Sequence, residues 1–231
     1  MRTPVKQSPH PDGRVERWRE HRLARRRQLV DATLEALETY GPEASLEQIA
    51  RIAGMPKPKI YRHFDDKADL IQAVGERLRD LALERLAEEL RPDTTVRDHV
   101  RRSLAAVLGL VAEHPNALRM LGRSNALTEG GRDIARSLIA FTEEDFSRAQ
   151  LPTDGIEPLT HALVGSVLGT ADWWLLQPEE ERLPLERLVA QLSVVILGAG
   201  DAALRTIGLS LDPDAIVGAE HLVPRDVSSR A

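Results

Sequence analysis

The chain has 231 residues, no cysteine and a formal net charge of -5, and 29% of its residues are charged while 3% are aromatic. This length suffices for one large domain, or for a small domain fused to a larger one. The lack of cysteine excludes disulfides, thiolate nucleophiles and thiolate metal sites. Because the sequence has no run of eighteen apolar residues and no apolar leader segment, we expect a soluble, cytoplasmic protein without a membrane partner.

The charge is distributed unevenly along the chain. Residues 1–64 hold 13 Lys and Arg against 8 Asp and Glu, whereas residues 65–231 hold 18 against 28. A basic head on an acidic body indicates that one end meets an anion while the other supplies folding or a different binding task.

The composition predicts an all-α fold, because Ala, Leu, Arg and Glu dominate and alternating runs of Val, Ile and Thr are missing. The opening sequence MRTPVKQSPHPDG has three prolines and no apolar period. Residues 1–20 are therefore predicted to be a mobile basic arm. Apolar side chains recur at three- and four-residue spacings from Leu23 to Tyr40, which predicts an amphipathic helix that Gly41 and Pro42 end.

A second, short helix follows at once. In the sequence SLEQIARIAG, Ser45 and Gln48 have the spacing of a capping box, in which the hydroxyl accepts from the third-position amide and the glutamine reaches back. Gly54 stops this helix and provides a turn.

A third helix is predicted in the sequence PKPKIYRHF. Pro58 fits a first helical turn, where its missing amide has no partner, and Ile60, Tyr61 and Phe64 are expected to share one helical face. Three helices of about 18, 9 and 7 residues, with a tight turn between the last two, predict a helix-turn-helix domain over residues 21–65, whose last helix can enter the major groove of DNA.

The rest of the chain is predicted to form a larger helical bundle over residues 66–210. A long helix begins at Asp65-Asp66 and ends before Pro92, and Pro and Gly punctuate the following ones. The further helices are expected at about 94–113, 115–123, 130–149, 155–176 and 184–209. Residues 211–231 are predicted to be a poorly ordered tail.

The third helix and its surroundings carry the candidate DNA contacts. Lys57 and Lys59 lie at its start, where ammonium groups and free amides face a phosphate or a base edge. Tyr61 can donate to a phosphate while its ring packs inward, and His63 can do the same or simply cap. Lys67 is unfavourable to the dipole at the start of the long helix, so a phosphate partner would explain it. The full predicted set is Ser45, Lys57, Pro58, Lys59, Tyr61, Arg62, His63 and Lys67.

Other basic side chains leave two interpretations open. Arg51 and Arg62, taken alone, are as consistent with plain solvation as with DNA contact. The arginines near the N-terminus either add phosphate or minor-groove contacts or act as a solubilising tail. These arm residues are Arg14, Arg17, Arg19, Arg22, Arg25, Arg26 and Arg27.

The residues of the head resemble the N-terminal signature of the TetR-type (TetR/AcrR) transcriptional regulators. The matching positions are Ser45-Leu46-Glu47-Gln48-Ile49-Ala50, Ala53-Gly54, Ile60-Tyr61, His63-Phe64, Lys67 and Leu70. The resemblance implies a ligand-responsive DNA-binding regulator, a repressor that acts as a homodimer on a palindromic operator. It assigns phosphate contacts to Tyr61 and Lys67.

Two positions depart from the family pattern. Pro56 stands where a Ser or Thr commonly caps the third helix, and Lys59 stands where a smaller residue is frequent. Because proline has no capping oxygen, we expect the cap to be weakened by about 1 kcal/mol. We infer an altered base preference rather than lost binding.

A dimer surface is expected because one helix-turn-helix reads only half a site. The last two long helices carry apolar stripes with interspersed glycines, which fit intramolecular packing or a partner helix. The resemblance implies that these helices pair as a four-helix bundle between two copies. The candidate dimer residues are Val164, Leu168, Ala171, Leu175, Leu192, Val195, Ile196, Ala199 and Ala203.

The resemblance also implies a small-molecule cavity among the helices between the head and the dimer helices. Isolated large or polar side chains there are the candidate ligand contacts, with ordinary core or surface roles as the alternative. These are Met120, Asn125, Phe141, Asp145, Phe146, His161, Asp172, Trp173 and Trp174. The adjacent Trp173 and Trp174 cannot share a helical face, so one is expected inside and the other at an edge. Few charges on the apolar faces favour an uncharged or amphipathic, lipid-like effector.

No catalytic, cofactor or metal motif is recognised. The sequence GSVLG lacks the serine position of a nucleophile elbow, and Glu157 and His161 have no second histidine for a metal site. We therefore expect a protein that is not an enzyme and needs no cofactor. The alternative function is an all-helical ligand- or protein-binding module without operator-specific DNA binding.

Overall fold

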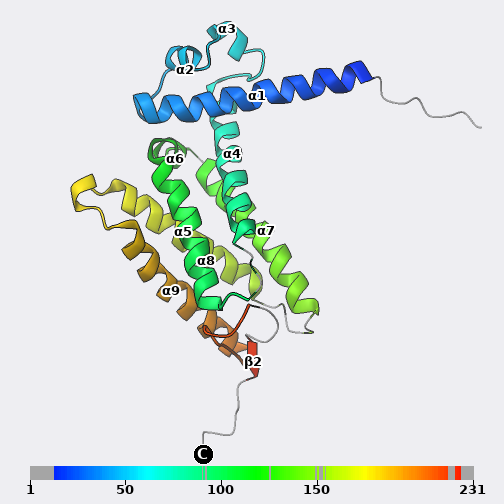
Figure 1. Cartoon of the computed structure of the whole chain (residues 1–231), viewed down its shortest axis with the longest axis vertical. Coiled ribbons are helices and arrows are strands. Elements are labelled where there is room, and N and C mark those ends of the chain that lie inside the picture. Colours follow the sequence, from blue (N-terminus) through cyan, green and yellow to red (C-terminus); the bar gives the residue numbers. More distant parts are fainter. Residues whose placement is uncertain are drawn as a thin grey trace, which may run out of the picture. The chain divides into compact units, whose positions relative to one another are not determined.

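The structure, a computed structural model, describes residues 13–89, 91, 93–124, 126–148, 150, 153, 155–217 and 222–224. Its helices are α1 (Gly13–Tyr40), α2 (Leu46–Ile52), α3 (Lys57–Ile60), α4 (Lys67–Glu88), α5 (Val96–Glu113), α6 (Pro115–Gly122), α7 (Ala126–Arg148), α8 (Ile156–Leu176) and α9 (Leu185–Thr206) (Figure 1). A 3-10 turn, η1 (Glu179–Glu181), and two short strands, β1 (Leu209–Leu211) and β2 (Leu222–Pro224), complete the described elements. The predicted all-α class is confirmed.

The chain divides into two compact units, Met1–Leu70 and Ile71–Ala231, with the division inside α4. The first unit contains α1 to α3 and the first residues of α4. The prediction of a mobile arm over residues 1–20 is wrong for residues 13–20, which belong to α1. Arg and Glu are good helix formers and dominate this stretch, so the helix continues ten residues beyond the apolar pattern that starts at Leu23. Residues 1–12 lie outside the described residues.

A small core holds the first unit together. The side chains of Leu37, Ile49, Ile60 and Phe64 are each at most 2% exposed. Removing such side chains from water supplies most of the stability of a short-helix unit, because isolated short helices are unstable. The expectation that Tyr61 shares their face is wrong, since its side chain is 48% exposed.

The second unit packs its core between α5, α8 and α9. The buried side chains of this core are Leu104, Leu108, Val111, Ala171, Trp174, Leu175, Leu188, Val189 and Leu192. The α8 C-terminus is tied by two arginines: Arg119 donates to the carbonyl oxygen of Leu175 at 2.9 Å, and Arg182 donates to that of Gln177 at 3.2 Å. These bonds satisfy carbonyl groups that the end of a helix leaves without partners.

One helix of this unit departs clearly from the predicted bounds. α7 begins at Ala126 rather than near residue 130, so the Gly130-Gly131 pair lies inside the helix. The Ala126 amide donates to the Ser124 hydroxyl at 3.3 Å, which satisfies an amide at the helix start. A Cβ atom on Gly131 would lie 2.4 Å from the Leu168 Cδ1 atom. Gly131 therefore permits the close approach of α7 and α8 and does not form a turn.

The predicted disordered tail over residues 211–231 is also corrected for its first part. Strand β1 pairs antiparallel with β2, and residues 213–217, which follow β1, contact the start of α5. The amides of Val96 and Arg97 donate to the carbonyl oxygens of Ala215 and Pro213, at 3.0 and 2.8 Å. An Arg97–Asp214 ion pair at 2.9 Å adds to them. Thus this segment caps α5, while residues 218–221 and 225–231 lie outside the described residues.

By length and composition, α9 would suffice to cross a membrane. One such helix is weak support for a membrane span, because an apolar core helix of a soluble protein passes the same test. Here α9 packs along α5 and α8, and its Leu188, Val189 and Leu192 side chains lie in the core.

Candidate nucleic-acid interface and effector cavity

The α2 helix starts with the predicted capping box. The Gln48 amide donates to the Ser45 hydroxyl at 3.3 Å, and the Ser45 amide donates to the Gln48 side-chain oxygen at 2.7 Å. Gly54 then takes a positive φ of 61°, where a side chain would cause strain, and the chain turns toward α3. The geometry therefore fixes the angle between α2 and α3 locally. The Ser45 hydroxyl is therefore engaged as the cap of α2.

The α3 helix has only four residues, fewer than the seven predicted. Pro56 is its N-cap and provides no side-chain hydrogen bond, as expected for a proline at this position. The Pro56 carbonyl accepts from the Lys59 amide at 2.8 Å, and Pro58 occupies the first turn. Ile60, the last residue of α3, is buried and anchors the helix to the core.

The predicted contact residues around α3 differ in their exposure and in the hydrogen bonds that their side chains make. Lys57 donates to the Glu47 carboxylate at 2.5 Å, and this bond raises the pKa of Lys57 and lowers that of Glu47. Pro58, Lys59 and Arg62 are exposed, and Tyr61 is half exposed. A phosphate near Lys57 must therefore compete with Glu47, whereas Lys59 and Tyr61 are accessible.

Lys67 opens α4, and its ammonium group donates to the Ala44 carbonyl oxygen at 3.2 Å. This bond lies within the first unit and links the start of α4 to the segment that precedes α2. The ammonium has further hydrogens to donate to a phosphate. The unfavourable position of Lys67 at a helix start is thus explained in part without DNA.

Arg26 was grouped with the arm by sequence, but it holds the unit together. Its guanidinium donates to the Asp69 carboxylate at 2.8 Å and to the His63 carbonyl oxygen at 2.7 Å. It also lies over the Phe64 ring, 4.2 Å from the centroid. The hydrogen bond from Arg26 lowers the pKa of Asp69. Arg26 therefore connects α1 to the segment that follows α3.

His63 lies in a strongly cationic setting. Burial lowers the pKa of His63, and the nearby cations of Arg22, Arg25, Arg26 and Arg62 lower it further. Its Nδ1 atom is buried and makes no hydrogen bond to the described residues. Arg26 is paired with Asp69, and the positive charges of Arg22, Arg25 and Arg62 near His63 favour an anion at this part of the unit.

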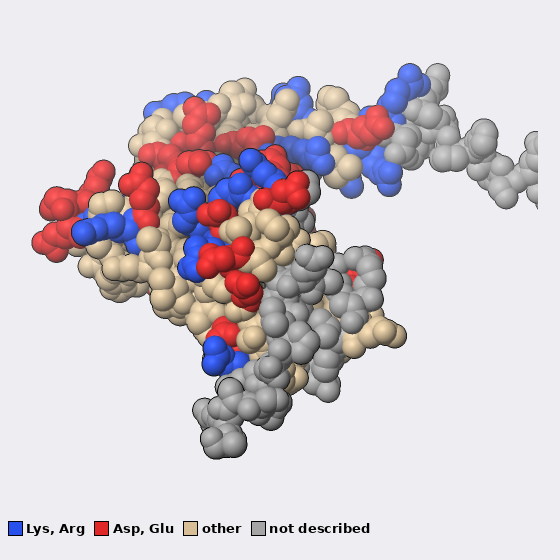
Figure 2. Space-filling view, turned by 60° about the horizontal axis from the view of Figure 1, so that its bottom comes forward, with Lys and Arg blue, Asp and Glu red and all other residues tan. Residues whose placement is uncertain are grey.

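The N-terminal half of α1 extends the basic surface. Arg17, Arg19, Arg22, Arg25 and Arg27 are exposed there, and Figure 2 shows Lys and Arg side chains along this helix interspersed with acidic ones. The exposed Trp18 ring lies 6.0 Å from the Arg22 guanidinium.

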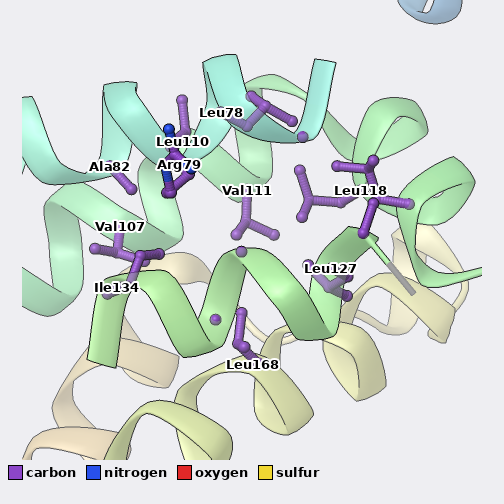
Figure 3. A pocket seen from close by; sticks show the side chains of 15 residues that line it. Leu78, Arg79, Ala82, Val107, Leu110, Val111, Leu118, Leu127, Ile134 and Leu168 are labelled. Atoms are coloured by element: carbon purple, nitrogen blue, oxygen red, sulfur yellow. The ribbon is translucent and has the colours of Figure 1, made fainter. Parts of the chain in front are cut away.

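The second unit contains an apolar cavity of about 60 Å³ between α4, α5, α6, α7 and α8 (Figure 3). Its lining residues are mostly aliphatic or glycine. They are Gly75, Leu78, Arg79, Ala82, Val107, Leu110, Val111, Leu118, Leu121, Ala126, Leu127, Gly130, Gly131, Ile134 and Leu168. Among these residues Arg79 is the one charged side chain.

The seven predicted ligand contacts whose side chains the structure describes are not among the residues that line this cavity. Trp174 is a core residue whose indole donates to the Leu183 carbonyl oxygen at 2.8 Å. Met120 is buried and Phe146 partly buried away from the cavity, whereas Phe141, His161, Asp172 and Trp173 are exposed. The side chains of Asn125 and Asp145 lie outside the described residues. Adjacent residues of a helix point in different directions, and the prediction that one indole lies inside and the other at an edge is confirmed: Trp174 is buried and Trp173 is exposed.

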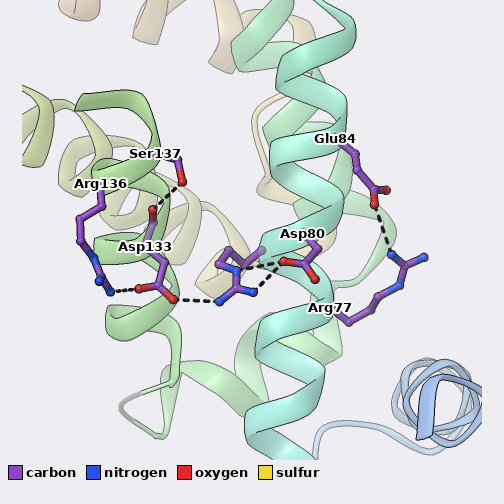
Figure 4. A network of polar contacts seen from close by, with 7 residues as sticks. Arg77, Asp80, Glu84, Asp133, Arg136 and Ser137 are labelled. Carbon is purple, nitrogen blue, oxygen red and sulfur yellow. Dashed lines mark hydrogen bonds and ion pairs between the residues drawn. The ribbon is translucent and has the colours of Figure 1, made fainter. Parts of the chain in front are cut away.

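Arg79 also borders a polar surface hollow next to the cavity. The hollow is lined by Arg79, Asp80, Leu83, Asp133, Arg136 and Ser137. The Arg79 guanidinium donates to the Asp133 carboxylate at 2.9 Å and to the Asp80 carboxylate at 2.7 Å. Arg136 donates to the other oxygen of Asp133 (Figure 4). The bond from Arg79 lowers the pKa of Asp133. An ion pair therefore joins α4 to α7 at the edge of the cavity.

The predicted dimer residues fall into two groups. Ala171, Leu175 and Leu192 are at most 5% exposed in the core of their own protomer, which leaves them no surface for a partner. Val195 is 55% exposed. The partly buried remainder is Val164, Leu168, Ile196, Ala199 and Ala203.

A head with a capped α2, a tight turn and a short, anchored α3, followed by a helical body, defines a helix-turn-helix transcriptional regulator. Residues 29–74 match the family described as bacterial regulatory proteins, tetR family. The chain is 30% identical over 191 residues to the uncharacterized HTH-type transcriptional regulator MT0489 of Mycobacterium tuberculosis (strain CDC 1551 / Oshkosh), with 80% of each chain covered. The chain belongs to the TetR family.

Two solved structures share the fold. A tetR-family transcriptional regulator from Streptomyces coelicolor superposes with a TM-score of 0.61 at 22% identity, over 78% of this chain and 84% of the other. The transcriptional regulator FadR from Bacillus subtilis, in complex with stearoyl-CoA, gives 0.58 at 17% identity, over 74% and 97%. At these identities the likeness shows the fold.

Proposed function

We propose that this TetR-family chain is a cytoplasmic repressor that binds a palindromic operator as a homodimer. A small amphipathic effector changes its affinity for the operator, either by releasing the protein from DNA or by promoting binding. The observation that carries the DNA-binding part is the accessible basic surface of α3. Lys59 on α3 and Arg62 in the turn after it are exposed, and the buried Ile60 between them anchors this segment, so their charges are presented in a defined direction. The role is one of binding and not of catalysis.

The proposed dimer face is the outward side of α8 and α9. Both helices leave small and apolar residues exposed at helical spacing. These are Gly165, Gly169, Trp173 and Leu176 on α8, and Val194, Val195, Gly198 and Ala202 on α9. A Cβ atom on Gly165, Gly169 or Gly198 would meet nothing within 4 Å, so another helix has room to approach these positions. Exposed apolar stripes of this kind mark interfaces.

The effector is proposed to act through α4. This helix starts at Lys67 in the first unit and contributes Leu78, Arg79 and Ala82 to the cavity in the second. A ligand that enters the cavity changes the packing of α4, and the spacing of the two heads in the dimer changes with it. The apolar lining supports an amphipathic effector, and the fold of FadR, solved with stearoyl-CoA, is compatible with one.

Selection of bound sequences from a pool of random DNA duplexes tests this function. Full-length protein should enrich a two-fold symmetric sequence with half-sites about one helical turn apart. A pool that stays unenriched after repeated rounds would exclude operator recognition and would favour a binding module without DNA specificity.

A further inference from the structure

Arg79 is placed at the meeting point of two different environments. It lines the apolar cavity together with Leu78 and Ala82 of the same helix, and it also lines the polar hollow together with Asp80 and Asp133. Its side chain is 26% exposed. A molecule with an apolar tail and a polar head can therefore place its tail in the cavity while its head meets the guanidinium.

The cavity is too small for such a tail unless the helices move. Its volume is about 60 Å³. A dry cavity that admits benzene has about 150 Å³. Entry of an alkyl chain must therefore push α4 away from its neighbours, and the Arg79–Asp133 ion pair resists this because it joins α4 to α7.

The ion pair can be exchanged without leaving a buried charge. Asp133 keeps the hydrogen bond from Arg136 if Arg79 leaves, and its side chain is 30% exposed. The Nε and Nη2 groups of Arg79 stay with Asp80, so displacement of Asp133 removes the acceptor of Nη1 alone. A carboxylate head can accept from Nη1 as Asp133 does, whereas a neutral head gives up this charge-assisted hydrogen bond. A cationic head cannot take the place of Asp133 on Arg79 and would leave this ion pair closed.

We propose that the effector is a single-chain carboxylate amphiphile, whose carboxylate replaces Asp133 on Arg79 while its alkyl tail enlarges the cavity. This assignment rests on the proposed function of the second unit as an effector-binding body. The exchange breaks the link between α4 and α7 at the moment when the tail separates them. Binding of the carboxylate to Arg79 and the separation of α4 from α7 therefore occur together.

Calorimetric titration of the full chain with sodium decanoate, decanol, decyltrimethylammonium and decanoyl-CoA tests the head group. Decanoate should bind about tenfold more tightly than decanol, because a hydrogen-bonded charge is lost in the alcohol. The cation should bind more weakly than decanoate, because it cannot replace Asp133 on Arg79. Decanol or the cation binding as tightly as decanoate would overturn the proposal. Tighter binding of decanoyl-CoA than of decanoate would also overturn it, in favour of a thioester ligand.

Three variants locate the exchange. Arg79→Gln should weaken decanoate binding about tenfold and leave decanol unchanged. Asp133→Asn should strengthen decanoate binding about fivefold, since the competing carboxylate is gone. Arg85→Gln is the matched control, because Arg85 forms an α4–α5 ion pair with Glu113 at 2.6 Å and does not line the cavity. It should leave decanoate binding unchanged.

The two substitutions at the ion pair can be interpreted independently. If Arg79→Gln unfolds, as thermal melting would reveal, Asp133→Asn decides alone, and unchanged decanoate affinity in that variant overturns the exchange. Operator affinity is measured on the same preparations. Lost decanoate binding with retained operator binding refutes the carboxylate effector but leaves the regulator function intact, whereas the reverse outcome refutes the regulator function alone.

Discussion

The head and the body of this chain differ in how their functional residues are held. In the head, hydrogen bonds between neighbours along the sequence place α2 and α3, as in the Ser45–Gln48 capping box and the turn at Gly54. In the body, the cavity is assembled from five helices, α4 to α8. A local site can be recognised from a sequence motif, whereas a cavity depends on which side chains fail to fill the space between helices.

The largest effect is expected at the dimer face, which depends on tertiary structure. Val194→Asp places a charge where a partner helix should bury Val194, whose side chain is 71% exposed in the protomer. The dimer dissociation constant should rise about a hundredfold, because a buried unpaired charge costs about 3 kcal/mol. Analytical ultracentrifugation measures it. Arg187→Ala, at an exposed position outside the stripe, is the control, and an unchanged dimer in the aspartate variant would contradict the assigned face.

In the head, Arg26→Ala should lower the free energy of unfolding by about 2 kcal/mol. The variant removes charge-assisted bonds to Asp69 and His63 and the stacking on Phe64. Chemical denaturation followed by circular dichroism measures the loss. Arg25→Ala, on the exposed side of α1, should change stability by less than about 0.5 kcal/mol. Equal effects in the two variants would show that the Arg26 contacts are not stabilising.

DNA contacts in the head should separate into two kinds. Tyr61→Phe and Lys67→Ala should weaken binding about tenfold for all sequences alike, because phosphate contacts carry no sequence information. Lys59→Ala should instead change which bases are preferred. Binding to a randomised operator library distinguishes the two, and a uniform effect of Lys59→Ala would remove the distinction.

Two adjacent glycines of α7 offer a matched test of packing in the body. Gly130→Ala should stabilise the chain by about 0.5–1 kcal/mol, since its Cβ would meet nothing within 4 Å and alanine favours a helix. Gly131→Ala should gain less, because its Cβ would force the Leu168 side chain to move. Thermal denaturation measures both. A larger gain at Gly131 would contradict the close approach of α7 and α8.

The smallest effect is a pH dependence from His63. Its pKa is lower in the folded chain than the unperturbed value of about 6.5. The unfolded chain therefore binds more protons as the pH falls through about 6.5 toward the folded pKa, so stability should decrease over that window. His63→Gln should flatten this part of the curve of unfolding free energy against pH. An identical curve in the variant would exclude His63 as the cause.

Sequence patterns predicted the helices and the local contacts of the head because these depend on spacing. The bounds of α5, α6, α8 and α9 lie within three residues of the expectation, and the missing side-chain cap at Pro56 was foreseen. Arg26 was missed because its partner Asp69 lies 43 residues away.

The cavity residues were missed for a physical reason. Large and polar side chains were chosen, but such side chains fill space, and the observed lining consists of aliphatic residues and glycines. One signal was available in the sequence of α4. Arg79 follows Leu78 and precedes Ala82 on the inward side of the helix, where a charge requires a partner.

The salt dependence of operator binding tests whether the chain reads a two-fold symmetric operator as a dimer. Fluorescence anisotropy should compare the selected palindrome with a duplex in which one half-site is scrambled. Affinity for the palindrome should exceed that for the scrambled duplex by about a thousandfold and fall by about a thousandfold between 50 and 200 mM salt. Equal affinity for both duplexes, without a salt dependence, would contradict operator reading by a dimer.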